Sequence, residues 1–245
     1  MTFRWGASTA PFTDLDGAEP ARFALEQVDD DRFRLLVPFR YQPPTGPPIE
    51  VTPDALGTTD LASIQTSLTW FVNRHGRHTP AALVHDLLVG RSTSPAERAA
   101  ADERFHQAMA DLDVPPVRRL VMWSAVTLAS RWAAGGWSRA GVVTWGLASV
   151  AGTALLVHGV VHRRPGQVVV ALVGPAAAAP LWGRQAVAGV VGGYALWVVV
   201  LPTAASLAGY GTYWAVEEGV RRLRTLGRRR GAPPAPGPVP FAETA

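Results

Sequence analysis

Residues 140–161 read AGVVTWGLASVAGTALLVHGVV, a stretch without a charged side chain. About 20 predominantly apolar residues are needed for a helix to cross the hydrocarbon core of a bilayer, so this stretch predicts a membrane-spanning helix. A second span is predicted at 186–208. The apolar stretch between them, 166–181, is shorter and holds Pro175 and Pro180, which predicts a kinked span or a re-entrant segment.

The charges divide the chain into two parts. Residues 1–135 hold 13 arginines and 16 acidic residues, as a water-soluble domain would. Residues 136–245 hold 10 arginines and only 3 acidic residues. We therefore expect a soluble domain over 1–135 and a transmembrane helical region over 136–210.

The overall composition excludes an intrinsically disordered chain and several kinds of catalytic chemistry. Of 245 residues, 48% are hydrophobic and 17% are charged, which excludes an intrinsically disordered chain. All 23 basic residues are arginines and cysteine is absent. Schiff-base chemistry, thiolate nucleophiles and cysteine-ligated metal sites are excluded.

The soluble part begins with a strand pattern. A β-hairpin is predicted over residues 22–41, with its turn at the acidic residues 29–31. Five alternating residues share one face of its second strand: Phe33, Leu35, Val37, Phe39 and Tyr41. Residues 49–51 predict a short third strand.

Helical spacing replaces the strand pattern after residue 58. Helices are predicted over about 61–71, 80–89, 95–112 and 117–132. Ser94 and Glu97 should form a capping box at the third of them. The sequence thus predicts an α+β fold: a small antiparallel hairpin or sheet, a helical bundle, and C-terminal transmembrane helices.

The C-terminal segments predict a membrane surface. Residues 211–230 form a basic amphipathic pattern, which favours a membrane-lipid partner over nucleic acid. The proline-rich residues 231–245 predict a disordered tail. Gly189 and Gly193 are spaced for close helix–helix packing, within the chain, in an oligomer or with a protein partner.

Four polar residues are candidates for chemistry: Asp60, His85, Asp86 and Asp102. An aspartate that orients a histidine ring leaves the other ring nitrogen free to act as a general base, and such groups can also bind a divalent metal. Helices 80–89 and 95–112 are joined by a short loop, so an antiparallel hairpin would bring His85 or Asp86 close to Asp102. The structural alternative makes Asp60 a helix cap and His85 with Asp102 a buried pair. No cofactor or particular metal follows from either interpretation.

Several ordered blocks resemble one family. They are FRLLVPFRY, IEVTPDALGTTDLAS, AALVHDLL, AADERFHQAM and VRRLVMWSAV. Residues 20–132 resemble the uncharacterised domain-of-unknown-function family 1353, which is common in bacteria and in phage and prophage genomes. The resemblance matches Thr59–Ser63, the pair His85 and Asp86, and the block with Ala101, Asp102 and Phe105.

Two positions depart from the family pattern. Gln65 replaces a usual proline, and Leu87 stands where an aromatic residue usually follows the His-Asp pair. The absent aromatic alters any pocket that it would line. Because the family has no established activity, the resemblance supports the domain and the candidate residues without naming a reaction.

Two functional hypotheses remain. The first is a membrane-anchored binding or assembly module, and the alternative is a hydrolase using the Asp/His cluster, with or without a metal. The first residues lack a signal-peptide pattern and the six arginines between 221 and 230 favour the cytoplasmic side. We expect a multi-pass protein of the cell membrane with both ends cytoplasmic, and two, three or four spans remain open.

Overall fold

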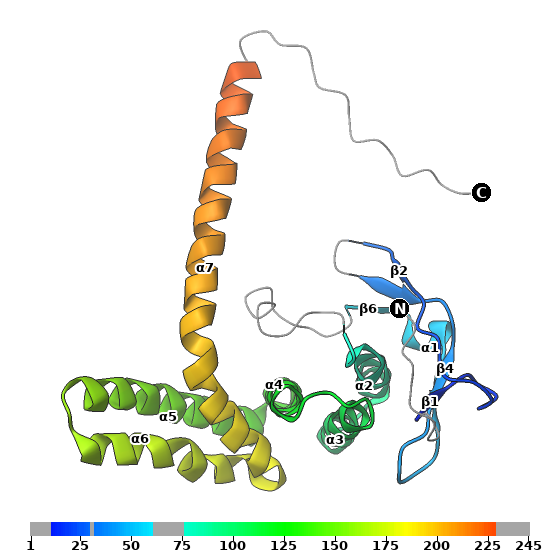
Figure 1. Cartoon of the computed structure of the whole chain (residues 1–245), viewed down its shortest axis with the longest axis horizontal. Coiled ribbons are helices and arrows are strands. Elements are labelled where there is room, and N and C mark those ends of the chain that lie inside the picture. The colour runs from blue at the N-terminus through cyan, green and yellow to red at the C-terminus, as the bar shows by residue number, and fades with distance from the viewer. Residues whose placement is uncertain (1–10, 30–31, 61–75, 229–245) are drawn as a thin grey trace. The chain divides into compact units, whose positions relative to one another are not determined.

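The computed structural model describes residues 11–29, 32–60 and 76–228. Its N-terminal part holds two small antiparallel sheets, and helices follow (Figure 1). One sheet has the order β1-β4-β5, with strands Phe12–Thr13, Phe39–Tyr41 and Ile49–Val51. The other has the order β2-β3-β6, with strands Leu25–Gln27, Phe33–Leu35 and Thr58–Thr59. The predicted α+β class is confirmed.

The predicted hairpin forms only in part. Strands β2 and β3 pair in antiparallel register, with Leu25 opposite Leu35. The prediction of one strand from 33 to 41 is wrong, because the chain leaves β3 after Leu35 and enters the other sheet at Phe39. Pro38 explains the break: it has no N–H for a ladder, and Val37 is accordingly 40% exposed.

The described residues of this part also form four helices. They are α1 (Pro53–Leu56), α2 (Thr79–Arg91), α3 (Pro95–Asp111) and α4 (Pro116–Ala134). The capping box is confirmed, since Ser94 and Glu97 satisfy each other's backbone N–H groups at the start of α3. The helix predicted over 61–71 lies outside the described residues.

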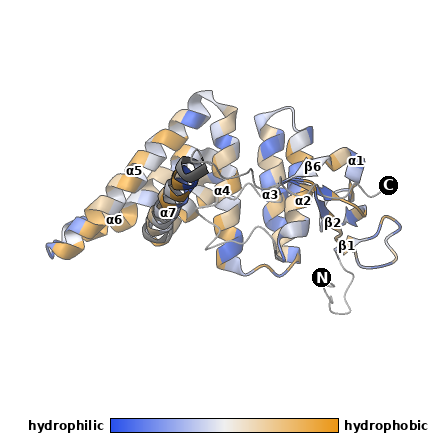
Figure 2. Ribbon diagram, turned by 90° about the horizontal axis from the view of Figure 1, so that it is seen from above, coloured by the Kyte–Doolittle hydropathy of each residue, from blue (hydrophilic) through white to orange (hydrophobic). Residues whose placement is uncertain are grey.

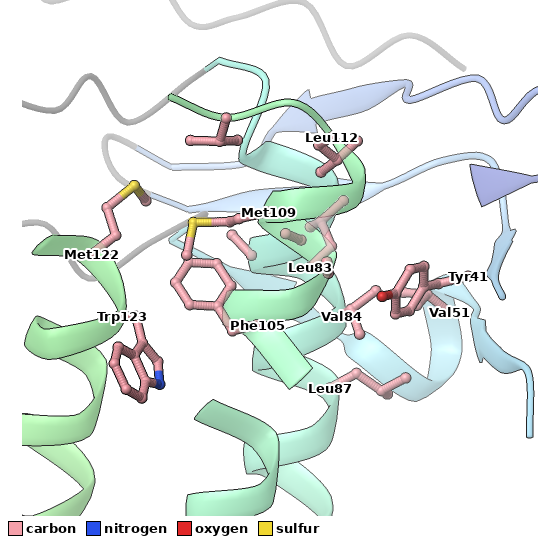
Figure 3. Packing of buried hydrophobic residues seen from close by; sticks show 14 of the residues in the cluster. Tyr41, Val51, Leu83, Val84, Leu87, Phe105, Met109, Leu112, Met122 and Trp123 are labelled. Carbon is pink, nitrogen blue, oxygen red and sulfur yellow. The ribbon is translucent and has the colours of Figure 1, made fainter. Parts of the chain in front are cut away.

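The core forms where α2 and α3 meet the strands (Figure 3). Leu83 and Leu87 of α2 are buried, as are Phe105 and Met109 of α3. Leu87 is therefore a core residue. Met122 and Trp123 extend the same cluster onto α4.

A polar contact fixes α3 to the first sheet. The hydroxyl of Tyr41 on β4 donates a hydrogen bond to Oδ2 of Asp111, at 2.6 Å. Burial, followed by the neighbouring Asp111, raises the pKa of Tyr41 above its ordinary value. The tyrosine therefore stays protonated and remains the donor.

The apolar region contains α5 (Gly136–Val161), α6 (Pro165–Ala178), the 3-10 helix η2 (Ala179–Gln185) and α7 (Ala186–Arg228). Figure 1 shows α5 and α6 lying side by side. Two segments of the described chain are long and apolar enough to cross a membrane, Gly136–Val161 and Pro165–Val198. The second is interrupted at Gly183, whose φ of 58° and ψ of −124° are not helical.

Glycines allow close packing in this region. A Cβ added to Gly193 of α7 would lie 2.6 Å from Cβ of Pro175 on α6, and one added to Gly189 would lie 3.1 Å from the Trp182 ring. The small-residue pattern is thus used for packing within the chain.

Many large apolar side chains of α5 and α6 face outward. Leu147 is 68% exposed and Val170 is 61% exposed. Figure 2 shows how apolar residues dominate both helices. Apolar surface on this scale suits contact with lipid.

The chain divides into two compact units, Met1–Val200 and Leu201–Ala245. In the second unit α7 continues to Arg228, so the third apolar stretch and the expected amphipathic segment share one helix. Glu218 and Arg222 pair there at 2.8 Å, one turn apart. The expected disordered tail lies outside the described residues.

Candidate functional site

Helices α2 and α3 form a hairpin that brings three of the four candidate residues together. His85 and Asp86 lie on α2, and Asp102 lies on α3, after a turn through residues 92–94. Ser94, the last residue of this turn, caps the N-terminus of α3, so the two helices run back along one another. The predicted approach of His85 to Asp102 is found.

The central contact is a histidine–carboxylate pair. Nε2 of His85 lies 2.9 Å from Oδ1 of Asp102. The Asp102 side chain is fully buried and that of His85 is 13% exposed. The ring of Phe105, one turn further along α3, lies 5.0 Å from the imidazole centroid. The imidazole is therefore held in one orientation by a buried anion and an aromatic neighbour.

The second ring nitrogen points toward Asp86. Nδ1 of His85 lies 3.9 Å from Oδ1 of Asp86, which is beyond direct hydrogen-bond range and is a spacing that one water molecule can bridge. The other oxygen of Asp86 accepts a hydrogen bond from the hydroxyl of Thr59 on β6. The second sheet thus fixes this carboxylate beside the ring.

Asp102 also contacts α4. The hydroxyl of Ser130 donates to Oδ1 of Asp102 over 3.1 Å, so one oxygen serves both the serine and the histidine. Oδ2 of Asp102 is buried and has no hydrogen-bond partner among the residues that the structure describes. An incompletely satisfied buried carboxylate is costly, and such groups are common at functional sites.

The surroundings favour a charged imidazole. Burial by itself lowers the pKa of His85, but the hydrogen bond to Asp102 and the nearby negative charges of Asp102 and Asp86 outweigh that effect. The pKa of His85 is raised above its ordinary value of 6.5. A raised pKa makes the neutral ring a stronger base than an isolated histidine.

Among the described residues, this geometry can supply a general base, and Ser130 is not placed as a nucleophile beside it. If Nε2 donates its hydrogen to Asp102, the lone pair on Nδ1 is free to take a proton from water. Ser130 donates to the carboxylate instead of the imidazole, so these three residues do not have the order of a Ser-His-Asp triad. No group of three histidine or acidic side chains in the described part of the chain could hold a metal ion.

The fourth candidate, Asp60, follows β6 directly and is partly buried. It is the last described residue before 61–75, so its expected role as a helix cap lies outside the described residues. Thr59, Phe105 and Ser130 complete the surroundings of the pair and were not among the candidates. Thr59 has the sequence signature of a helix cap, and nothing in the sequence pairs Ser130 with a residue 28 positions earlier.

Most of the residues around this pair lie within one segment that matches a known family. Residues 33–126 match the family DUF1353, described as a protein of unknown function. The resemblance seen in the sequence is confirmed over this range. The match contains Thr59, His85, Asp86 and Asp102, and it ends four residues before Ser130. No curated protein and no solved structure matches the chain.

Proposed function

We propose that this DUF1353 protein is a membrane-attached hydrolase in which His85 is the general base. The observation that carries the proposal is the 2.9 Å contact between Nε2 of His85 and Oδ1 of Asp102, which leaves Nδ1 on the side of Asp86. Two carboxylates and one imidazole converge at this point. Separate helix caps would not produce that convergence.

The reaction uses water as the nucleophile. Nδ1 of His85 takes a proton from a water molecule as the water oxygen attacks an acyl carbon. Asp102 orients the ring and stabilises the imidazolium that forms, and is therefore a positioning residue. Asp86 accepts a hydrogen bond from the same water and orients it. The imidazolium then returns the proton to the leaving group.

Attachment to a membrane is supported by the apolar helices. Two segments are long and apolar enough to cross a bilayer, and α5 and α6 expose large apolar side chains. Helix α4 joins them to the family domain, since it contacts both α3 and α5. We propose a cell-membrane location, with the hydrolytic site on the domain that precedes the apolar helices.

The direct test measures hydrolysis of the soluble ester p-nitrophenyl butyrate by the full chain in detergent micelles. We expect His85→Gln to lower the rate by about 100-fold or more, because general-base catalysis contributes that much. Glutamine retains an N–H donor for Asp102 but is not a base. A wild-type rate equal to that of His85→Gln would contradict the proposal.

Matched variants on α3 separate catalysis from folding. His106→Ala removes a histidine that stacks on Trp123, with centroids 4.8 Å apart, and Asp111→Asn alters a carboxylate that binds Tyr41. Both should keep the wild-type rate within a few-fold. Asp102→Asn should lower it. A loss of equal size in all variants would indicate a general loss of structure.

The alternative is a binding or assembly module. The observation that favours it is the bond from Ser130 to Asp102, which links α4 to α3 and suits a structural role for the buried carboxylate. A protein partner or a second copy would then use this domain at the membrane. In that case His85→Gln would change no hydrolytic rate, and chemical cross-linking of the full chain in membranes would yield a defined larger species.

A further inference from the structure

Helix α4 connects the histidine–carboxylate pair to the apolar helices through adjacent residues. Ser130 binds Asp102, and Arg131 donates to the carbonyl oxygens of Trp182 and Leu181 at 2.9 and 3.1 Å. The Arg131 guanidinium also lies 5.5 Å from the centroid of the Trp182 ring. One turn of α4 therefore contacts both the candidate site and the 3-10 helix η2 between α6 and α7.

Exposed aromatic residues follow immediately. Trp132 is 50% exposed and Trp137, at the start of α5, is 94% exposed. The Arg139 guanidinium lies 5.1 Å from the centroid of the Trp132 ring, and its Nε donates to the Trp132 carbonyl oxygen. Tryptophan with arginine at the end of an apolar helix is typical of the level where lipid headgroups meet the hydrocarbon core.

The spacing places the candidate site near that level. Ser130 precedes Trp132 by two residues, which is about 3 Å along a helix axis. Its hydroxyl is 3.1 Å from Asp102, and Asp102 is 2.9 Å from His85. A hydrolase held at this depth meets ester groups of lipids, which lie between headgroup and hydrocarbon.

We propose, resting on the hydrolase function above, that the substrate is an acyl ester of a membrane glycerophospholipid. The water oxygen bonds to the acyl carbon while its proton passes to Nδ1 of His85. The ester C–O bond breaks, and the leaving glycerol oxygen receives the proton back from His85. The products are one fatty acid and one lysophospholipid, with no oxidant or co-substrate other than water.

The test uses the full chain reconstituted in vesicles of phosphatidylcholine and phosphatidylglycerol, with fatty acid and lysophospholipid measured by mass spectrometry. The wild type should release both products in equal amounts. His85→Gln should lower their release by about 100-fold or more, and Asp111→Asn should leave it within a few-fold. Release of both products by His85→Gln at the wild-type rate would overturn the proposal.

A second variant tests separately whether the site lies at the level of the lipid headgroups. Trp137→Ala changes a side chain that is 94% exposed, so folding should be unaffected. We expect it to slow vesicle hydrolysis several-fold and to leave p-nitrophenyl butyrate hydrolysis unchanged, because only the lipid reaction depends on seating at the interface. Equal rates on vesicles for Trp137→Ala and wild type would contradict this seating.

The two substrates distinguish the two proposals. Hydrolysis of p-nitrophenyl butyrate that depends on His85, with intact vesicle lipids, would overturn the lipid substrate and leave the hydrolase. Hydrolysis of neither substrate by the wild type would overturn both.

Discussion

The hydroxyl of Ser130 donates a hydrogen bond to Oδ1 of Asp102 over 3.1 Å. The two residues belong to different helices, and Ser130 lies beyond the segment that matches the family. The bond therefore ties α3, which lies within the matched segment, to the end of α4 that leads into the apolar region. It also supplies one of the two donors that the fully buried carboxylate receives in the described structure.

Ser130→Ala tests the stability contributed by this bond. We expect the free energy of unfolding to fall by about 1 kcal/mol, because a buried acceptor loses a donor. Ester hydrolysis should stay within a few-fold, since His85 and Asp102 remain. Chemical unfolding in detergent measures the first quantity, and an unchanged unfolding curve would show that the bond contributes nothing.

Gly193→Ala tests the packing of α6 against α7. Its Cβ would lie 2.6 Å from Cβ of Pro175, a ring atom that cannot rotate away. We expect a loss of about 1–3 kcal/mol in stability, the usual cost of overpacking. Gly146→Ala is the matched control, because a Cβ there meets nothing within 4 Å. Equal thermal stability of the two variants would contradict the packing described.

Membrane topology is a third prediction. The arginines at 221–230 favour the cytoplasmic side for the C-terminus, and we expect the N-terminal domain on the same side. Such a chain crosses an even number of times. Protease protection of tags at both ends, in inverted and right-side-out vesicles, measures on which side of the membrane each terminus lies. Tags on opposite sides would require an odd number of crossings.

The helices predicted over 80–89, 95–112 and 117–132 agree with α2, α3 and α4 because their sequence signals are local. The start of α3 is predicted by a capping pattern of Ser94, Pro95 and Glu97, and α4 ends at Gly135. Strand boundaries depend on partners elsewhere in the chain. Alternation made residues 33–41 resemble one strand, whereas Pro38 separates two strands that belong to different sheets.

Of the contacts in the candidate site, the sequence predicted only the central one, between His85 and Asp102. A hairpin of two helices joined by a short turn is a local feature, and it places His85 against Asp102. The hydroxyls of Thr59 and Ser130 reach the carboxylates from β6 and α4, across 27 and 28 residues. Tertiary packing brings these hydroxyls to the carboxylates, and no periodicity or spacing in the sequence predicts those contacts.

Stability should depend on pH through His85. Its folded pKa is raised above 6.5, so protonation favours the folded state. This contribution is complete below the unfolded pKa of about 6.5 and is lost as pH rises through the folded value. Unfolding curves of wild type and His85→Gln should therefore differ in their pH dependence across this range. Parallel curves would contradict the raised pKa.

The measurement that bears most directly on the proposed general base is the pH profile of kcat/KM for p-nitrophenyl butyrate, in wild type and Asp102→Asn. The wild-type value should rise with pH through one ionisation above 6.5, because only the neutral imidazole accepts a proton. Asp102→Asn removes a charge that raises the pKa of His85, so its ionisation should move to lower pH, with a lower plateau. A wild-type profile without an ionisation above pH 6.5, or one unmoved in Asp102→Asn, would contradict the role of His85.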